Sequence, residues 1–147
     1  IVITTNGGYP LDQNAYQCPK GMSAAEATVN DGGVIIMLAT CQDGHGGESY
    51  YHSIADAESA DAFFQQCLHT PQVETLPDQW CAQIWCRIVR KYKVLFVADK
   101  AQEQLIRDLK VEYFETLDEA YARARELKGP DATLACIPNG VSVVVKD

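Results

Sequence analysis

With 147 residues, 47% of them hydrophobic, the chain is long enough for one domain with its own core and too apolar to be disordered. The formal net charge of −8 argues against nucleic acid or an anionic membrane surface as a partner. No apolar run approaches the ~20 residues that a membrane-spanning helix needs, and no signal peptide is visible. Because the sequence opens inside an apolar strand pattern at Ile1, we expect a domain at the end of a longer protein.

Strand and helix patterns alternate along most of the chain. Apolar, β-rich runs occupy residues 1–5, 34–39, 94–98 and 111–114, and helix patterns occupy 14–30, 49–55, 59–68, 79–91, 101–109 and 116–128. The alternation predicts an α/β fold, Rossmann-like, with a mainly parallel sheet flanked by helices in a single domain, 1–147. Two further β-rich runs, 132–137 and 140–146, surround a Pro-Asn-Gly turn, which predicts a hairpin at the C-terminus or the end of a strand.

Two glycine-rich loops follow the first two strands, at 6–10 (NGGYP) and 41–48 (CQDGHGGE). Parallel strands end at one edge of a sheet, so the loops predict the crevice where such sheets bind ligands. Both loops lack G-x-G-x-x-G and the P-loop lysine, which makes a nucleotide only a weak inference. His45 with Asp43 has the groups for metal binding or proton transfer, although a lone histidine between glycines also fits an ordinary loop residue.

Between the loops lies the segment NAYQCPKGM, which begins at Asn14. Asn14 followed by Gln17 is a capping-box pattern and predicts a helix that begins there. In that helix Tyr16 and Lys20 are i,i+4 neighbours, and Gln17 and Lys20 are i,i+3 neighbours. A phenol, an amide and an ammonium would then meet at the positive end of a helix, where backbone donors stabilise an anion.

Two features of this segment leave alternatives open. Pro19 has no amide hydrogen and disturbs a helix that begins at Asn14. The helix therefore continues or begins again at Ser23, which forms a second capping box with Glu26. On pattern alone, a solvated surface lysine at Lys20 and a core-edge position for Tyr16 explain the segment at least as well.

The helix at 79–91, capped by Asp78, has an apolar stripe at helical spacing that contains Trp85. Trp85 is therefore expected in the core. Trp80 lies well off this stripe, in the first turn, where a ligand would approach. It either covers a neighbouring loop or forms an apolar wall for a small substrate.

Six cysteines are spread through the chain, and none forms a C-x-x-C pair. Zinc sites prefer tightly paired ligands, so we expect no structural metal. Several cysteines lie in apolar stripes, which predicts buried, reduced thiols and a cytoplasmic protein. Two cysteines on either side of a substrate would suit a proton-transfer racemase, but nothing in the sequence activates a thiol.

The stretch GGYPLDQNAYQCPKGMSAAEATVNDGGVIIMLATCQDGHGGESYY resembles the carboxyl-terminal domain of the nickel-dependent lactate racemase family. The resemblance is dense over residues 1–51 and looser through 147. In that family this domain contributes a Tyr-Gln-x-x-Lys segment and a tryptophan to a cleft between domains. The resemblance therefore implies substrate-binding roles for Tyr16, Gln17, Lys20 and Trp80. The family segment need not contain Pro19, which makes the local helix geometry an open question.

The resemblance also implies a division of labour. An N-terminal catalytic domain of the same chain would hold a nickel-pincer nucleotide, a pyridinium dithio derivative, through a lysine and would supply the histidines. This chain would then contain no catalytic or metal-binding residue. It would act as a lid that completes the site of a 2-hydroxyacid racemase or epimerase and would be inactive alone. The residues themselves leave a second reading open, a Rossmann-like module that binds a small anion or nucleotide without catalysis.

Overall fold

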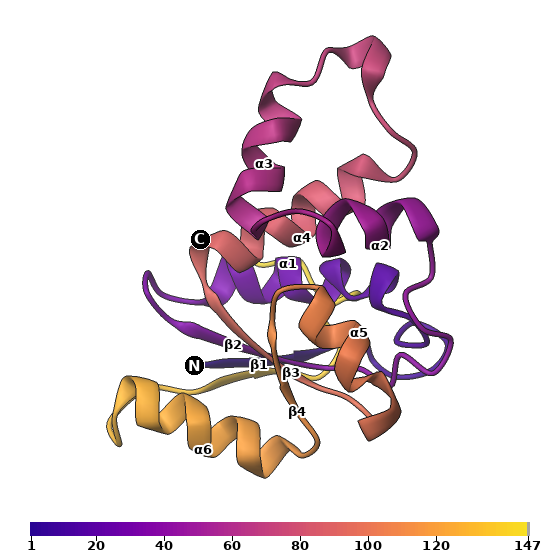
Figure 1. Cartoon of the computed structure of the whole chain (residues 1–147). Helices are drawn as coiled ribbons and strands as arrows, with labels where there is room; N and C mark the ends of the chain where they lie inside the picture. The colour runs from indigo at the N-terminus through magenta and orange to yellow at the C-terminus, as the bar shows by residue number, and fades with distance from the viewer. Residues whose placement is uncertain (147) are drawn as a thin grey trace.

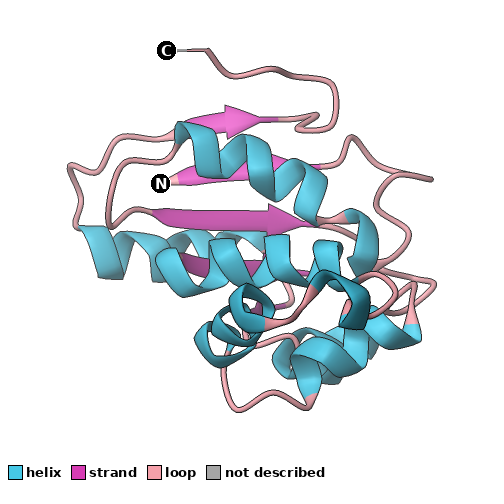
Figure 2. Cartoon of the chain, turned by 90° about the horizontal axis from the view of Figure 1, so that it is seen from above, coloured by secondary structure: helices cyan, strands magenta, loops and turns pink. Residues whose placement is uncertain are grey.

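A five-stranded sheet in the order β4-β3-β2-β1-β5 forms the centre of the molecule in a computed structural model that describes residues 1–146 (Figure 1). Its strands are β1 (Val2–Thr5), β2 (Val34–Leu38), β3 (Lys93–Val97), β4 (Glu112–Phe114) and β5 (Ala135–Ile137). All four strand pairs are parallel, and the strands seen in Figure 2 point the same way. The expected α/β fold with a parallel sheet is confirmed.

The central strand β2 is covered on both faces, as its unbroken apolar run predicts. Ile35 and Met37 face one hydrophobic cluster, whereas Val34 and Ile36 face the other, and all four are fully buried. In register, Ile36 pairs with Ile3 on β1 and with Leu95 on β3.

The helices are divided unequally between the two faces of the sheet. They are α1 (Pro19–Thr28), α2 (Glu48–Ala55), α3 (Ala60–His69), α4 (Gln79–Lys91), α5 (Glu103–Asp108) and α6 (Leu117–Lys128), with short 3-10 turns η1 (Ala15–Gln17), η2 (Gln72–Glu74) and η3 (Lys100–Gln102). Residues of α1 to α5 share the larger cluster, whereas α6 packs alone on the opposite face (Figure 1). The chain steps from β1 to β4 in one direction and returns to β5 through α6. Right-handed crossovers put that returning helix on the other face.

The first long helix begins at Pro19, so the prediction of a helix from Asn14 is wrong. Asn14 precedes only the 3-10 turn η1, and its side chain makes no capping hydrogen bond. Proline suits the first position of an α-helix, where no amide hydrogen is needed. The predicted capping box at Ser23 is also wrong, because Ser23 lies inside α1 and its hydroxyl donates to the Pro19 carbonyl at 2.7 Å.

The expected C-terminal hairpin does not form within residues 1–146, and the alternative, the end of a strand, is the one observed. β5 pairs in parallel with β1, and residues 140–146 form no strand within the part of the chain that the structure describes. The Gly140 amide donates to the Thr5 carbonyl at 2.8 Å, which turns the chain across the end of β1. A side chain on Gly140 would lie 2.7 Å from the Cα of Gly21, so the chain passes directly against α1 instead of folding back on β5.

Four of the six cysteines are buried, as their apolar surroundings predict: Cys18, Cys41, Cys81 and Cys86. Cys67 is half-buried and Cys136 is exposed. Burial raises the pKa of the Cys81 and Cys86 thiols to about 12. Over residues 1–146, no helix is both long and apolar enough to span a membrane.

Candidate functional site

Lys20 and Gln17 lie next to each other at the junction of η1 and α1. The Lys20 ammonium donates to the Gln17 side-chain oxygen at 2.5 Å, so the expected i,i+3 contact is formed even though the helix begins later. Lys20 is exposed, and none of the ion pairs among residues 1–146 includes it. The site therefore presents a cation whose charge is free to meet an anionic ligand.

Tyr16 lies between the core and the surface. Its ring meets the buried Tyr50 edge-on at 5.4 Å and the Trp80 indole edge-on at 6.1 Å, between ring centroids. Its hydroxyl donates to Asp78 Oδ1 at 3.0 Å. Burial, followed by this hydrogen bond, raises the pKa of Tyr16 to about 12, so the phenol stays protonated at neutral pH.

Three of the four expected site residues border one pocket of about 100 Å³. Its lining consists of Tyr16, Pro19, Lys20, Ser23, Trp80, Cys81 and Ile84. Trp80 is 57% exposed, in contrast to Trp85, which is fully buried. The off-stripe tryptophan therefore forms an apolar wall beside Lys20, and Gln17 joins the pocket through its bond to Lys20. Lys20 and Trp80 are both exposed, and we refer to Tyr16, Gln17, Lys20 and Trp80 together as the half-pocket.

Asn6 holds this segment in place, and it was not singled out from the sequence. Its side chain is fully buried, and its amide group donates to the carbonyls of Leu11, at 2.6 Å, and Gln17, at 2.8 Å. Its carbonyl oxygen accepts from the Gly21 amide at 3.0 Å. One side chain thus ties the end of β1 to both η1 and α1, which sets the position of Gln17 and Lys20.

The second glycine loop supports the same segment through its backbone. The Gly44 and His45 carbonyls accept hydrogen bonds from the amides of Ala15, at 3.0 Å, and Tyr16, at 3.1 Å. These are the backbone donors that were expected to hold an anion, and they are already occupied. The predicted anion site therefore lacks these two donors and stays a prediction, and the exposed Lys20 side chain is a cation beside the pocket.

The His45 side chain packs within its own loop and against α2. Its Nδ1 accepts from the Gly47 amide at 3.1 Å, and its ring stacks on Tyr51 at 5.0 Å. Asp43 is exposed on the same loop. Within residues 1–146, no group of three or more His, Cys, Asp or Glu side chains could hold a metal ion.

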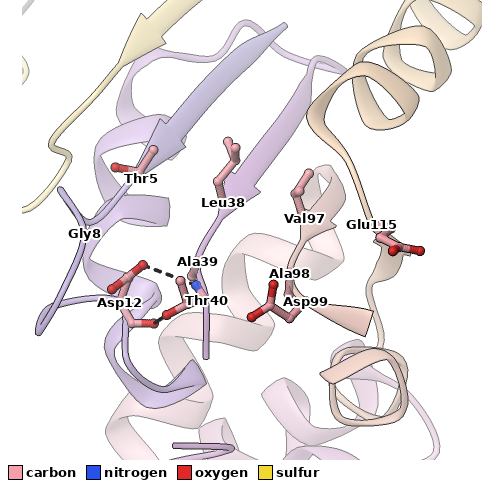
Figure 3. A pocket seen from close by; sticks show the side chains of 10 residues that line it. All are labelled: Thr5, Gly8, Asp12, Leu38, Ala39, Thr40, Val97, Ala98, Asp99 and Glu115. Atoms are coloured by element: carbon pink, nitrogen blue, oxygen red, sulfur yellow. Dashed lines mark hydrogen bonds between the residues drawn. The ribbon is translucent and has the colours of Figure 1, made fainter. Parts of the chain in front are cut away.

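A larger hollow of about 320 Å³ lies at the expected crevice, beyond the carboxyl ends of β1, β2 and β3 (Figure 3). Its lining includes three carboxylates, Asp12, Asp99 and Glu115, and Gly8 from the first loop. The Asp12 side chain accepts a hydrogen bond from the Thr40 amide at 3.2 Å. No residue of the 41–48 loop lines this hollow, and no lysine or arginine does. An acidic lining disfavours phosphate, which argues against the nucleotide-binding alternative.

The fold and the half-pocket together define a class: a parallel α/β module with a cation, an amide, a phenol and an indole at one place on its surface. Comparison with protein families identifies the family of this chain. The model of the lactate racemase C-terminal domain matches residues 1–145, and the chain belongs to that family.

Relatives and a solved structure agree with this assignment. The chain is 50% identical over 146 residues to a lactate racemase of Lactiplantibacillus plantarum and 45% identical over 147 residues to one of Thermoanaerobacterium thermosaccharolyticum. It covers 34% of each, so it spans about a third of the length of these relatives. The structure of the lactate racemase apoprotein from T. thermosaccharolyticum matches 99% of this chain with a TM-score of 0.96 and 44% identity, over 35% of that chain.

Proposed function

We propose that this chain is the substrate-binding lid domain of a lactate racemase, an isomerase that interconverts the enantiomers of a 2-hydroxyacid. It completes an active site in the cleft to an N-terminal domain of the same protein. The observation that supports this most strongly is the convergence of Lys20, Tyr16 and Trp80 on one half-open pocket, with Gln17 bound to Lys20. The family assignment and the relatives named lactate racemase support the reaction and the substrate.

Each side chain suits one part of lactate. The Lys20 ammonium pairs with the carboxylate, and its remaining hydrogens stay available after its bond to Gln17. The Gln17 amide hydrogens can donate to the same carboxylate or to the hydroxyl. Trp80 packs against the methyl group. Such a pocket orients the substrate, and closure by a second domain would exclude water and strengthen the pairing.

The nickel-pincer nucleotide, which would supply the hydride-accepting chemistry, belongs to the N-terminal domain in this arrangement. The residues described here do not fit that group, because no cluster of metal-ligating side chains is present among residues 1–146. The roles left to this chain are to bind the carboxylate, orient the substrate and close the site.

The direct test uses the full-length protein with its cofactor. Supplied with pure L-lactate or D-lactate, it should produce the other enantiomer, as measured by chiral chromatography, whereas the 147-residue chain with the same additions should not. A full-length protein that leaves both enantiomers unchanged would refute the function. Turnover by the 147-residue chain alone would refute the division between domains.

A further inference from the structure

Asp78 holds an unusual position at the start of α4. It occupies the N-cap, a favoured site for aspartate, yet its side chain makes no capping hydrogen bond. Its backbone is left-handed, with φ of 60°, which costs energy for a residue with a side chain. Its carboxylate instead accepts the hydrogen bond from the Tyr16 hydroxyl, 62 residues away in sequence. The Asp78 carboxylate is thus bonded to a side chain that lines the pocket.

We propose that Asp78 is a positioning residue that sets the gap between the Tyr16 ring and the Trp80 indole, and thereby the size of substrate the pocket accepts. This inference rests on the proposed function. Tyr16 comes from η1 and Trp80 from α4, so the width of the pocket depends on what joins these two elements. The Cys81 thiol, which contacts the Tyr16 carbonyl at 3.4 Å, holds only the main chain. The Asp78 carboxylate holds the side chain, two residues from Trp80.

The hydrogen bond also fixes what Tyr16 can do. Its only proton is donated to Asp78, so toward any further partner the phenolic oxygen acts as an acceptor. An acceptor there suits the hydroxyl of a 2-hydroxyacid and complements Lys20, which binds the carboxylate. A ring held in place beside Trp80 leaves room for a methyl group and disfavours longer side chains.

The test compares Asp78→Gly and Asp78→Asn in the full-length, cofactor-loaded enzyme. Glycine tolerates the left-handed backbone, so the start of the helix is preserved, and it removes the carboxylate that accepts the Tyr16 hydrogen bond. Asparagine tolerates the same backbone and keeps an acceptor oxygen. Thr116→Gly is the matched control, since Thr116 is a true N-cap, on α6 at the opposite face of the sheet.

Asp78→Gly should lower kcat/KM for lactate by about tenfold or more and reduce the preference for lactate over 2-hydroxybutanoate. Asp78→Asn should retain most of the parental kcat/KM and most of the parental preference. Thr116→Gly should match the parent. With tyrosine labelled at the ring carbon that bears the hydroxyl, the NMR signal that Tyr16→Phe removes should shift in Asp78→Gly, and the pKa of Tyr16 should fall below about 12.

Parental kinetics and preference in Asp78→Gly would overturn the inference, as would a Tyr16 signal that does not move. The two proposals fail in distinguishable ways. A parent enzyme that leaves lactate unchanged refutes the proposed function, and the Tyr16 signal then decides by itself whether Asp78 positions the phenol.

Discussion

The side-chain oxygen of Asn6 accepts a hydrogen bond from the Gly21 amide at 3.0 Å, and the side-chain NH2 of Asn6 donates one to the Gln17 carbonyl. The end of the first strand is therefore bonded directly to the two elements that contain Gln17 and Lys20. Gly21 is required for this approach, because a side chain there would lie 2.5 Å from the Asn6 oxygen. The half-pocket is thus attached to the sheet through a buried polar side chain.

Replacing that side chain should destabilise the domain. Asn6→Ala leaves the buried Gly21 amide without its acceptor and removes the donor to two partly buried carbonyls, which should reduce the free energy of unfolding by about 2–4 kcal/mol. Urea unfolding of the 147-residue chain measures this change. Asn30→Ala is the control, because Asn30 is exposed on the turn after α1 and should change stability by about 0.5 kcal/mol or less. Equal stability of the two variants would contradict a stabilising role for the Asn6 hydrogen bonds.

Two adjacent glycines in the second loop should respond differently to alanine. A side chain on Gly46 would lie 2.5 Å from the Asn14 side chain, and its φ of 80° disfavours alanine. At Gly47 the nearest atoms are 3.7 Å away and the backbone is extended. Gly46→Ala should therefore lower the thermal midpoint and raise KM for lactate in the full-length protein, whereas Gly47→Ala should leave the midpoint nearly unchanged. Similar losses in both variants would count against a supporting role for this loop.

The two tryptophans should separate stability from binding. Trp85 is fully buried, so Trp85→Ala should cost about 3–5 kcal/mol of unfolding free energy. Trp80 is 57% exposed, so Trp80→Ala should cost about 1 kcal/mol or less while raising KM for lactate in the full-length protein. Urea unfolding and steady-state kinetics on both variants measure these effects. A Trp80→Ala enzyme with parental KM would remove the indole from the site.

Alkaline pH should destabilise the domain partly through Tyr16. Burial and the bond to Asp78 raise the pKa of Tyr16 from about 10 to about 12, so the folded state retains a proton that the unfolded state has lost. This stabilisation is fully present below pH 10 and is lost as the pH rises toward 12. Tyr16→Phe should therefore make the fall in unfolding free energy between these values shallower. A fall as steep as in the parent chain, in urea titrations across the range, would contradict the assignment.

Much of the fold was predictable because it depends on local pattern. The apolar run of β2 and the alternation of strand and helix correctly predicted a parallel sheet. The helix pattern at 116–128 matches α6, where Thr116 and Glu119 form both bonds of a capping box. In such cases the hydrogen bonds that decide the structure lie within a few residues.

The errors occurred where residues far apart in the sequence determine the local structure. The cap expected at Asn14 fails because Pro19 sets the helix start and the second loop occupies the neighbouring amides. The C-terminal hairpin fails because Gly140 packs against Gly21. No spacing rule shows that Asp78 would bond to Tyr16 instead of capping its own helix.

The site was predictable to a similar extent. The family segment predicted Tyr16, Gln17 and Lys20, and helical spacing separated Trp80 from the core stripe. The structure brings these side chains to one place, and their role in binding substrate stays a prediction. Asn6 was missed because its role depends on three partners that fold against it from elsewhere in the chain.

The most direct test of the account measures the kinetics of Lys20→Ala in the full-length protein, with Lys128→Ala as the control. Both lysines are exposed, but Lys128 lies on α6, on the opposite face of the sheet. Loss of the cation that meets the carboxylate should raise KM or lower kcat for lactate by about tenfold or more, while Lys128→Ala keeps the parental values. Unchanged kinetics in Lys20→Ala would show that this half-pocket does not hold the substrate.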